Sequence, residues 1–154
     1  MDFDNIDLAI LREIQTDSRI SNSELARRVN LSQPATHTRL KRLEKQGVVQ
    51  EYVALLDRDA LGLDMVCFVQ IGLLAHSESA LNGFQTAIGE MPEVLECYHL
   101  TGQFDYSLKV VLPNRRELER FLRTKIVPMT GINRISTSIV LSEIKATTAL
   151  PLPD

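Results

Sequence analysis

The chain has 154 residues and a formal net charge of −3, and its 44% hydrophobic content is that of an ordinary globular protein of one domain or two small ones. No apolar run is long enough to span a membrane, and the acidic start lacks the basic and apolar regions of a signal peptide. Two widely separated cysteines, Cys67 and Cys97, lie in apolar, strand-like runs and have no metal-binding spacing, so we expect buried free thiols in a cytoplasmic protein.

The first fifty residues have the pattern of three helices. Isoleucines repeat at helical spacing in the first, which we expect to begin near Asp4 or Asn5. Ser21 is a good N-cap for the second, and Glu24 three residues later completes a capping box. Asn30 then breaks the helix, and Ser32 caps a third helix that Gly47 ends. A short helix, a tight turn and a longer helix predict a helix-turn-helix.

Charge supports a role for this segment in DNA binding. Between Arg19 and Lys45 there are seven Arg or Lys and only two Glu, although the whole chain is acidic. A solvated helix face is the plainer interpretation, but a basic third helix at this spacing suits insertion into a major groove of double-stranded DNA. The residues that we expect to contact DNA are Ser32, Gln33, Pro34, Thr36, His37, Arg39, Lys41 and Arg42.

The rest of the chain alternates between strands and helices. Residues 48–56 are rich in β-formers and predict a strand and hinge, and residues 65–74 are so uniformly apolar that we expect a strand buried on both faces. A helix from Ser77 or Ser79, strands over 94–101 and 105–112, a helix capped by Asn114 and a strand over 135–144 complete a β-α-β-β-α-β order. This order is the ferredoxin-like arrangement, with both helices on one face of the sheet.

The predicted organisation is therefore α+β, with a DNA-binding domain over 1–50, a strand and linker over 51–62 and a ferredoxin-like domain over 63–154. Residues 1–50 carry eight basic and seven acidic groups, whereas residues 51–154 carry nine and thirteen. The sheet face without helices needs a partner, which favours a homodimer formed through the C-terminal domain.

Several motifs make the chain resemble the Lrp/AsnC (leucine-responsive/asparagine-responsive, feast/famine) transcription regulators over almost its whole length. The resemblance rests on Asp7-Leu8-Ala9-Ile10-Leu11, Glu24-Leu25-Ala26, Leu31-Ser32, Arg39-Leu40-Lys41-Arg42-Leu43-Glu44, Gly47-Val48-Val49, Pro92-Glu93-Val94, Thr101-Gly102 with Asp105-Tyr106, and Lys145-Ala146-Thr147-Thr148-Ala149-Leu150-Pro151. It implies a winged helix-turn-helix, dimers that commonly assemble to octamers, and an amino-acid effector bound near a boundary between subunits.

The resemblance places the effector at the hairpin that begins at Thr101. Turn amides would meet the carboxylate of a free α-amino acid, and Asp105 would accept from its ammonium. Taken alone, Gly102 and Asp105 favour a plain hairpin turn, and only the resemblance favours a ligand site. The residues expected at the ligand are Tyr98, Leu100, Thr101, Gly102, Gln103, Phe104, Asp105, Thr137 and Ser138.

Three functions compete. The first is a DNA-binding transcription regulator that responds to an amino acid. The second is an architectural DNA-organising protein without an effector, and the third is a small enzyme on the ferredoxin-like domain. His99 lies two residues after Cys97 on one strand, but chance also gives this spacing and the sequence places no third ligand, so an ordinary strand is favoured over a metal or catalytic site. We expect no catalytic residues, no metal and no cofactor.

Overall fold

The computed structural model describes residues 3–74 and 78–153. The chain forms two compact units, one of Met1–Leu55 with Lys145–Asp154 and the other of Leu56–Ile144. No helix among the described residues is both long and apolar enough to cross a membrane.

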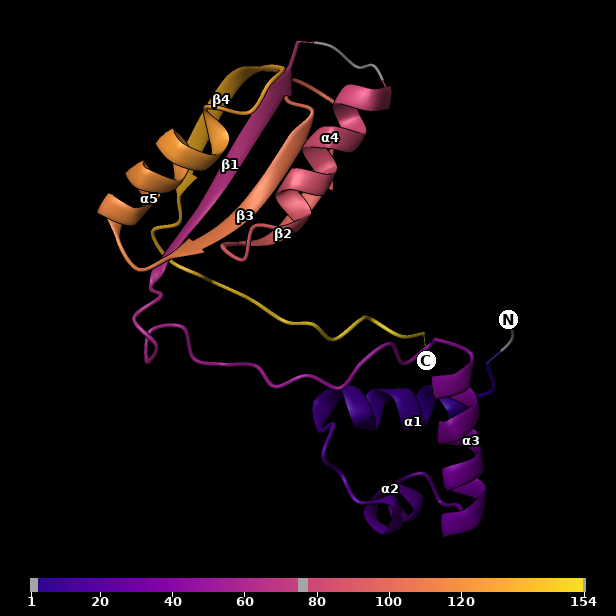
Figure 1. Cartoon of the computed structure of the whole chain (residues 1–154). Coiled ribbons are helices and arrows are strands. Elements are labelled where there is room, and N and C mark those ends of the chain that lie inside the picture. The colour runs from indigo at the N-terminus through magenta and orange to yellow at the C-terminus, as the bar shows by residue number, and fades with distance from the viewer. Residues whose placement is uncertain (1–2, 75–77, 154) are drawn as a thin grey trace. The chain divides into compact units, whose positions relative to one another are not determined.

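Three helices form the N-terminal unit, as the sequence predicts: α1 Asn5–Thr16, α2 Asn22–Arg28 and α3 Gln33–Lys45 (Figure 1). Ile10, Leu25 and Leu43, one from each helix, are almost fully buried at its centre. Each helix begins at a side-chain cap, because the first backbone N–H groups of a helix have no partner within it. The capping side chains are Asp4, Ser21 and Ser32, which accept from the N–H groups of Asp7, Glu24 and Ala35.

Two residues with positive φ fix the path of the chain around α3. Asn30 has φ 54° in the turn between α2 and α3, a conformation that Asn tolerates better than most side chains. Gly47 has φ 72° directly after the end of α3, so it serves as the C′ residue that its position predicts.

The linker after α3 differs from the prediction. Residues 51–57 form no strand, and 58–62 form turns that a hydrogen bond from Leu63 N to Arg58 O closes at 2.8 Å. A β-rich segment becomes a strand only when another strand accepts its hydrogen bonds, and no neighbouring strand within the described part of this chain pairs with it.

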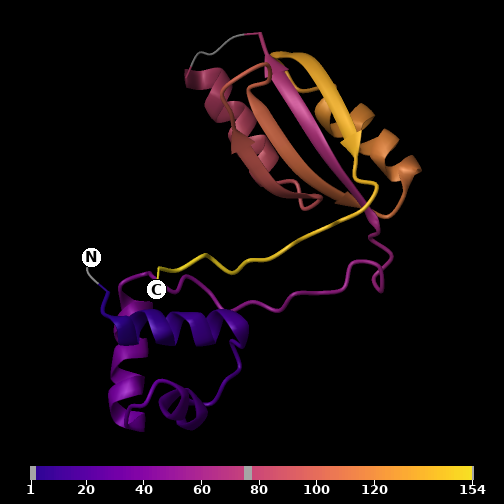
Figure 2. The same ribbon diagram turned by 180° about the vertical axis from the view of Figure 1, so that it is seen from behind.

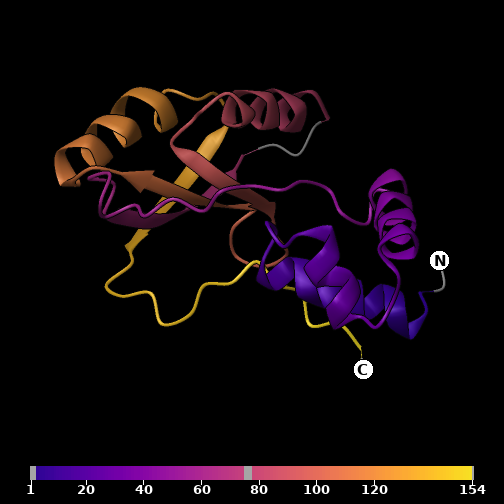
Figure 3. The ribbon, with the colours of Figure 1, turned by 90° about the horizontal axis from the view of Figure 1, so that it is seen from below.

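The second unit is a four-stranded sheet in the order β2-β3-β1-β4, antiparallel throughout. Its strands are β1 Met65–Leu73, β2 Val94–His99, β3 Tyr106–Leu112 and β4 Ile132–Ile139. Its helices are α4 Glu78–Gly89 and α5 Arg115–Phe121, which continues into a π-helical turn, η1 Leu122–Ile126. Figures 1 to 3 show the helices on one face of this sheet, the layering that a ferredoxin-like order predicts. The predicted start of α4 at Ser77 lies outside the described residues.

At the centre of β1 burial is one-sided, contrary to the expectation of burial on both faces, although Val66 near the start of the strand is buried on the side without helices. Cys67, Val69 and Ile71 are fully buried under the helices, whereas Phe68 on the opposite face is 40% exposed. We call the face without helices the open face. Its central positions are Phe68 and Gln70 of β1, Ser107 and Lys109 of β3, Glu96 and Tyr98 of β2, and Ser136 and Ser138 of β4.

The C-terminal segment belongs to the N-terminal unit, whereas the sequence predicts it as part of the ferredoxin-like domain. β4 ends at Ile139, and residues 145–154 group with the helices of the N-terminal unit instead of with the sheet. The carbonyl and N–H of Leu150 both bond to the side chain of Gln15 on α1. The predicted boundary of 63–154 therefore differs from the compact units of the structure.

Candidate DNA interface and ligand site

Six of the eight predicted DNA-binding residues are exposed on α3 or at its cap. Gln33, Pro34, His37 and Lys41 are exposed and follow one another at helical spacing. Lys41 bonds to Glu44 one turn later at 2.6 Å, an exposed contact that is readily exchanged for a phosphate. Ser32 is also exposed, but its hydroxyl caps the helix.

Thr36 is not available to a ligand, although the sequence analysis placed it at the interface. Its side chain is fully buried, and its hydroxyl donates to the carbonyl of Ser32 at 3.0 Å. Thr36 lies seven residues before Leu43 on the apolar side of α3, so helical periodicity turns it toward the core.

Arg39 and Arg42 point to a buried carboxylate that the sequence analysis did not select. Asp7 on α1 is 2% exposed, and its two oxygens accept from Arg39 Nη1 at 2.9 Å and Arg42 Nη2 at 2.5 Å. Arg39 also bonds to Asp4 at 2.6 Å. The backbone N–H of Asp7 and the guanidinium of Arg39 together lower the pKa of Asp4. These two arginines hold α3 against α1, because a buried carboxylate needs charged partners.

Charge on α2 is also paired internally. Glu24 accepts from Arg27 at 2.6 Å and from Arg28 at 2.8 Å, so its carboxylate serves these guanidinium groups instead of closing the predicted capping box. The two hydrogen-bonded arginines lower the pKa of Glu24 to about 2. The basic character of the helix-turn-helix is therefore smaller at its surface than the residue count suggests.

The predicted ligand hairpin joins β2 to β3 and closes through Leu100 N, which donates to Asp105 O at 2.8 Å. Gly102 has φ 120° at its tip, a conformation that favours glycine. Asp105 ties the hairpin to β1, since its N–H donates to Ile71 O at 2.9 Å and its Oδ2 accepts from Leu73 N at 2.7 Å. One carboxylate oxygen of Asp105 therefore has a structural role.

Arg134 on β4 reaches this hairpin, and the sequence analysis did not select it. Its guanidinium lies 4.5 Å from the centre of the Phe104 ring, and Nη2 donates to the carbonyl of Gln103 at 2.5 Å. A cation over an aromatic face is attracted by the ring electrons. Nothing in the sequence pattern marked Arg134, because only the pairing of β4 with β1 brings it opposite Gly72 and beside the hairpin.

The other predicted ligand residues are divided between places. Tyr98 and Leu100 are exposed, and the hydroxyl of Tyr98 bonds to Glu96 on the open face. Thr137 pairs with Val69 and Ser138 with Phe68, so consecutive side chains point to opposite faces. Their partners on β1 precede Ile71, the residue to which the hairpin is attached. The structure thus brings together Gln103, Phe104 and Asp105, with Arg134 in place of Thr137 and Ser138.

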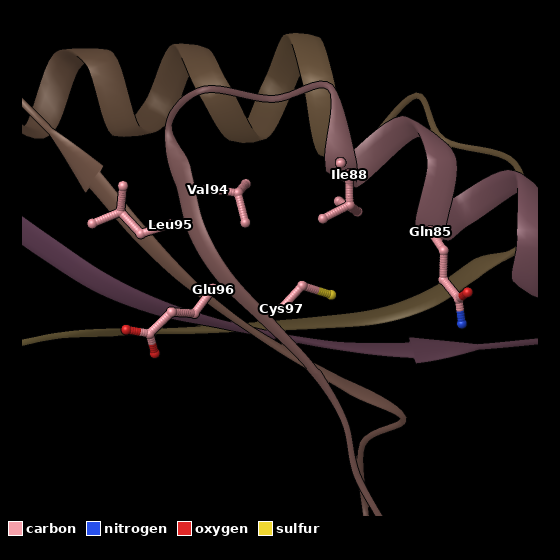
Figure 4. Close-up of a pocket in the computed structure, with 7 residues that line it drawn as sticks. Gln85, Ile88, Val94, Leu95, Glu96 and Cys97 are labelled. Carbon is pink, nitrogen blue, oxygen red and sulfur yellow. The ribbon is translucent and has the colours of Figure 1, made fainter. Parts of the chain in front are cut away.

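A separate cavity of about 400 Å³ lies between α4 and β2. Figure 4 shows Cys97 near Ile88 and Gln85 farther along the helix. Gln85 donates to the hydroxyl of Tyr106 at 2.9 Å, and His99 stacks on the same ring. Cys97 is exposed at the sheet edge, contrary to the expected burial, whereas Cys67 is buried and burial raises the pKa of its thiol. Among the described residues no group of three His, Cys, Asp or Glu is placed to hold a metal ion.

Comparison with known proteins assigns both units. Residues 3–50 match the winged helix-turn-helix DNA-binding family, and residues 66–150 match the Lrp/AsnC ligand binding domain. The chain belongs to the Lrp/AsnC family. The leucine-responsive regulatory protein of Escherichia coli strain K12 is 38% identical to it over 149 residues, which cover 97% of this chain and 91% of that protein.

Solved structures of Lrp/AsnC regulators have the same fold. A transcriptional regulator from Neisseria meningitidis in complex with L-Met matches with a TM-score of 0.94 and 34% identity over 97% of each chain. Escherichia coli AsnC matches with a TM-score of 0.90 and 26% identity over 98% of this chain and all of that one. This Lrp/AsnC chain is therefore a transcription regulator with a DNA-binding helix-turn-helix unit and a ligand-binding unit.

Proposed function

We propose that the exposed side of α3 reads double-stranded DNA, and that a free α-amino acid bound at the Thr101–Asp105 hairpin regulates this binding. The observation that carries the proposal is the division of α3 into two sides. Arg39 and Arg42 bond to Asp7, which leaves Gln33, His37 and Lys41 exposed for contact with bases and phosphates.

The hairpin offers the partners that an amino acid needs. Its turn amides and the guanidinium of Arg134 suit a carboxylate, and the carboxylate of Asp105 suits an ammonium group. Phe104 and Leu100 provide apolar surface beside them, which favours an apolar or sulfur-containing side chain. The L-Met bound by the Neisseria meningitidis relative agrees with this preference.

Assembly follows from the open face. Phe68 and Tyr98 expose apolar surface there, and Lys109 bonds to Glu96 at 3.1 Å beside them. A sheet covered by helices on one side, with exposed aromatic side chains among the polar residues of the other, is typical of a face that a second copy covers. We infer a homodimer through this face that assembles further to an octamer, with two helix-turn-helix units per dimer.

The competing functions have less support. An enzyme would bring a nucleophile and a base, or paired carboxylates, into one pocket. The cavity beside Cys97 offers a single thiol, a glutamine already bonded to Tyr106, and one carboxylate, Glu96, that is bonded to Lys109. An architectural protein would not need an effector hairpin of mixed charge. We place this regulator in the cytoplasm, and we propose that it works without a cofactor.

Titration of the full chain by calorimetry with each of the twenty amino acids tests the effector, with L-Met as the expected ligand. Fluorescence anisotropy of a labelled operator, with and without L-Met, tests its effect on DNA binding. Binding of DNA that no amino acid changes would favour the architectural function. Absence of DNA binding at low salt would contradict the proposal as a whole.

A further inference from the structure

The last residues of the chain line a groove of the N-terminal unit. Residues 147–153, which we call the strap, follow β4 without helix or strand structure. Leu150 and Leu152 line a groove of about 710 Å³ together with Leu11 and Ile14 of α1 and Val48. Figures 1 and 2 show the end of the chain beside α1. The strap therefore forms one wall of this groove, opposite residues of α1.

Gln15 recognises the main chain of the strap as a neighbouring β-strand would. Its Oε1 accepts from Leu150 N at 2.6 Å, and its Nε2 donates to Leu150 O at 3.3 Å. A side-chain amide that makes both bonds to one residue is specific for extended backbone, because the N–H and C=O must point the same way.

Two further contacts place the strap. Arg12 lies one turn before Gln15 on α1 and donates to the carbonyl of Pro153. Leu152 packs against the core that contains Ile10 and Leu25. Pro151 and Pro153 have no N–H and a fixed φ, so the strap loses little conformational freedom when it binds.

We propose that the strap is a structural part of the DNA-binding unit and that its seating on α1 controls the position of α3. α1 is held at both ends: Gln15 near its C-terminal end bonds to the strap, and Asp7 in its first turn bonds to Arg39 and Arg42 of α3. The strap also continues the chain from β4 of the ligand-binding unit. It therefore gives a second covalent route, besides the linker after α3, from the effector domain to the helix-turn-helix.

This inference predicts that loosening the strap weakens DNA binding without any change at α3. In the full chain, Gln15→Ala should speed hydrogen exchange of the Leu150 amide about tenfold or more, since its acceptor is lost. Operator affinity should fall several-fold, a readout that rests on the proposed DNA binding. Gln46→Ala, at an exposed glutamine of the same unit, is the matched control and should change neither. Circular dichroism checks that each variant is folded.

A second pair removes packing and leaves the hydrogen bonds. Leu152→Ala should also speed exchange at Leu150 and reduce operator affinity, whereas Leu141→Ala, at an almost fully exposed leucine, should not.

Unchanged exchange at Leu150 in both Gln15→Ala and Leu152→Ala would overturn the seating of the strap. Faster exchange with unaltered operator affinity would overturn its control of α3. Wild-type protein that binds no DNA would contradict the proposed function, and the exchange measurements would still decide the seating. Protection of Leu150 that rises with protein concentration would show a strap donated by a second copy and would overturn the intramolecular arrangement.

Discussion

Asp7 of α1 and Arg39 of α3 form a hydrogen-bonded ion pair of 2.9 Å in which the carboxylate is almost completely shielded from water. Arg42, about one turn later on α3, donates to the other carboxylate oxygen of Asp7. The helix expected to read DNA is therefore fixed to the first helix by the same residue type that usually binds phosphate.

Replacing Asp7 with Asn should destabilise the N-terminal unit. We expect a loss of about 2 to 3 kcal/mol, below the roughly 3–5 kcal/mol of a fully buried pair, because both arginines are partly exposed. Urea unfolding followed by circular dichroism measures this loss. Asp59→Asn, at an exposed position in the turns after the linker, is the control. Equal unfolding midpoints for the Asp7 variant and wild type would show that the pair does not hold α3.

Lys41→Ala and His37→Ala should have different effects on DNA binding. Removing Lys41 should weaken binding to all sequences and reduce the dependence of log K on log salt by about one phosphate contact. Removing His37 should change which operator is preferred and leave that slope nearly unchanged. Anisotropy titrations at several salt concentrations measure both. Arg116→Ala removes an exposed charge outside the helix-turn-helix, and a slope change of the same size there would argue against a contact at Lys41.

Asp105 should tolerate Asn better than Ala. Asn retains an oxygen that can accept from Leu73 N, whereas Ala leaves this partly buried N–H without its acceptor and should cost about 1–3 kcal/mol. Asn also removes the negative charge proposed to bind the ammonium of the effector. We therefore expect Asp105→Asn to unfold like wild type but to bind L-Met at least tenfold more weakly in calorimetry. Wild-type affinity in this variant would exclude Asp105 from the ligand site.

Acid should reduce the contribution of Glu24 to the stability of the N-terminal unit. The folded-state pKa of about 2 lies below the ordinary 4.5, so the unfolded chain takes up the proton first as pH falls. The stabilisation from Arg27 and Arg28 is complete above pH 4.5 and is lost as pH falls toward 2. Glu24→Gln should flatten this part of the stability curve, whereas Glu119→Gln on α5 should not. Parallel curves of unfolding free energy against pH for Glu24→Gln and wild type, between pH 5 and 2, would show that Glu24 does not cause this pH dependence.

A charge placed on the open face should prevent dimer formation. Phe68→Glu puts a carboxylate at the centre of the face, where a partner would have to bury it while the neighbouring Lys109 is already bonded to Glu96. Light scattering should give a monomer mass at micromolar concentration, against a dimer or larger assembly for wild type. Val127→Glu changes an exposed apolar residue directly after η1, in the helical layer, and should leave the mass unchanged. A monomeric wild type would contradict the proposed assembly.

Local patterns in the sequence were sufficient for most of the fold. The caps at Ser21, Ser32 and Asn114 and the C′ position of Gly47 depend on neighbours a few residues away, and all are found where they were predicted. The β-α-β-β-α-β order also follows from local periodicity. The strand predicted over residues 48–56 does not form in the structure, because a strand needs a hydrogen-bonding partner that local sequence does not specify.

The sites were less predictable because they depend on long-range contacts. The bond between Asp7 and Arg39 joins residues 32 positions apart, and the bond between Gln103 and Arg134 joins residues 31 apart. A count of basic residues cannot distinguish an arginine that faces DNA from one that faces a buried carboxylate. Thr36 shows the complementary failure, because its polar side chain suggested an interface while its helical position placed it in the core.

The three tyrosines give this protein a set of internal optical probes. The chain has no tryptophan, so its near-ultraviolet signal comes mainly from Tyr52, Tyr98 and Tyr106. Tyr52 follows α3 and donates to Glu44, and desolvation with this bond raises its pKa to about 12. Tyr98 lies on the open face, and Tyr106 is buried beneath His99. Replacing them with Phe one at a time would resolve events at the helix-turn-helix, at the dimer face and in the sheet core without adding a dye.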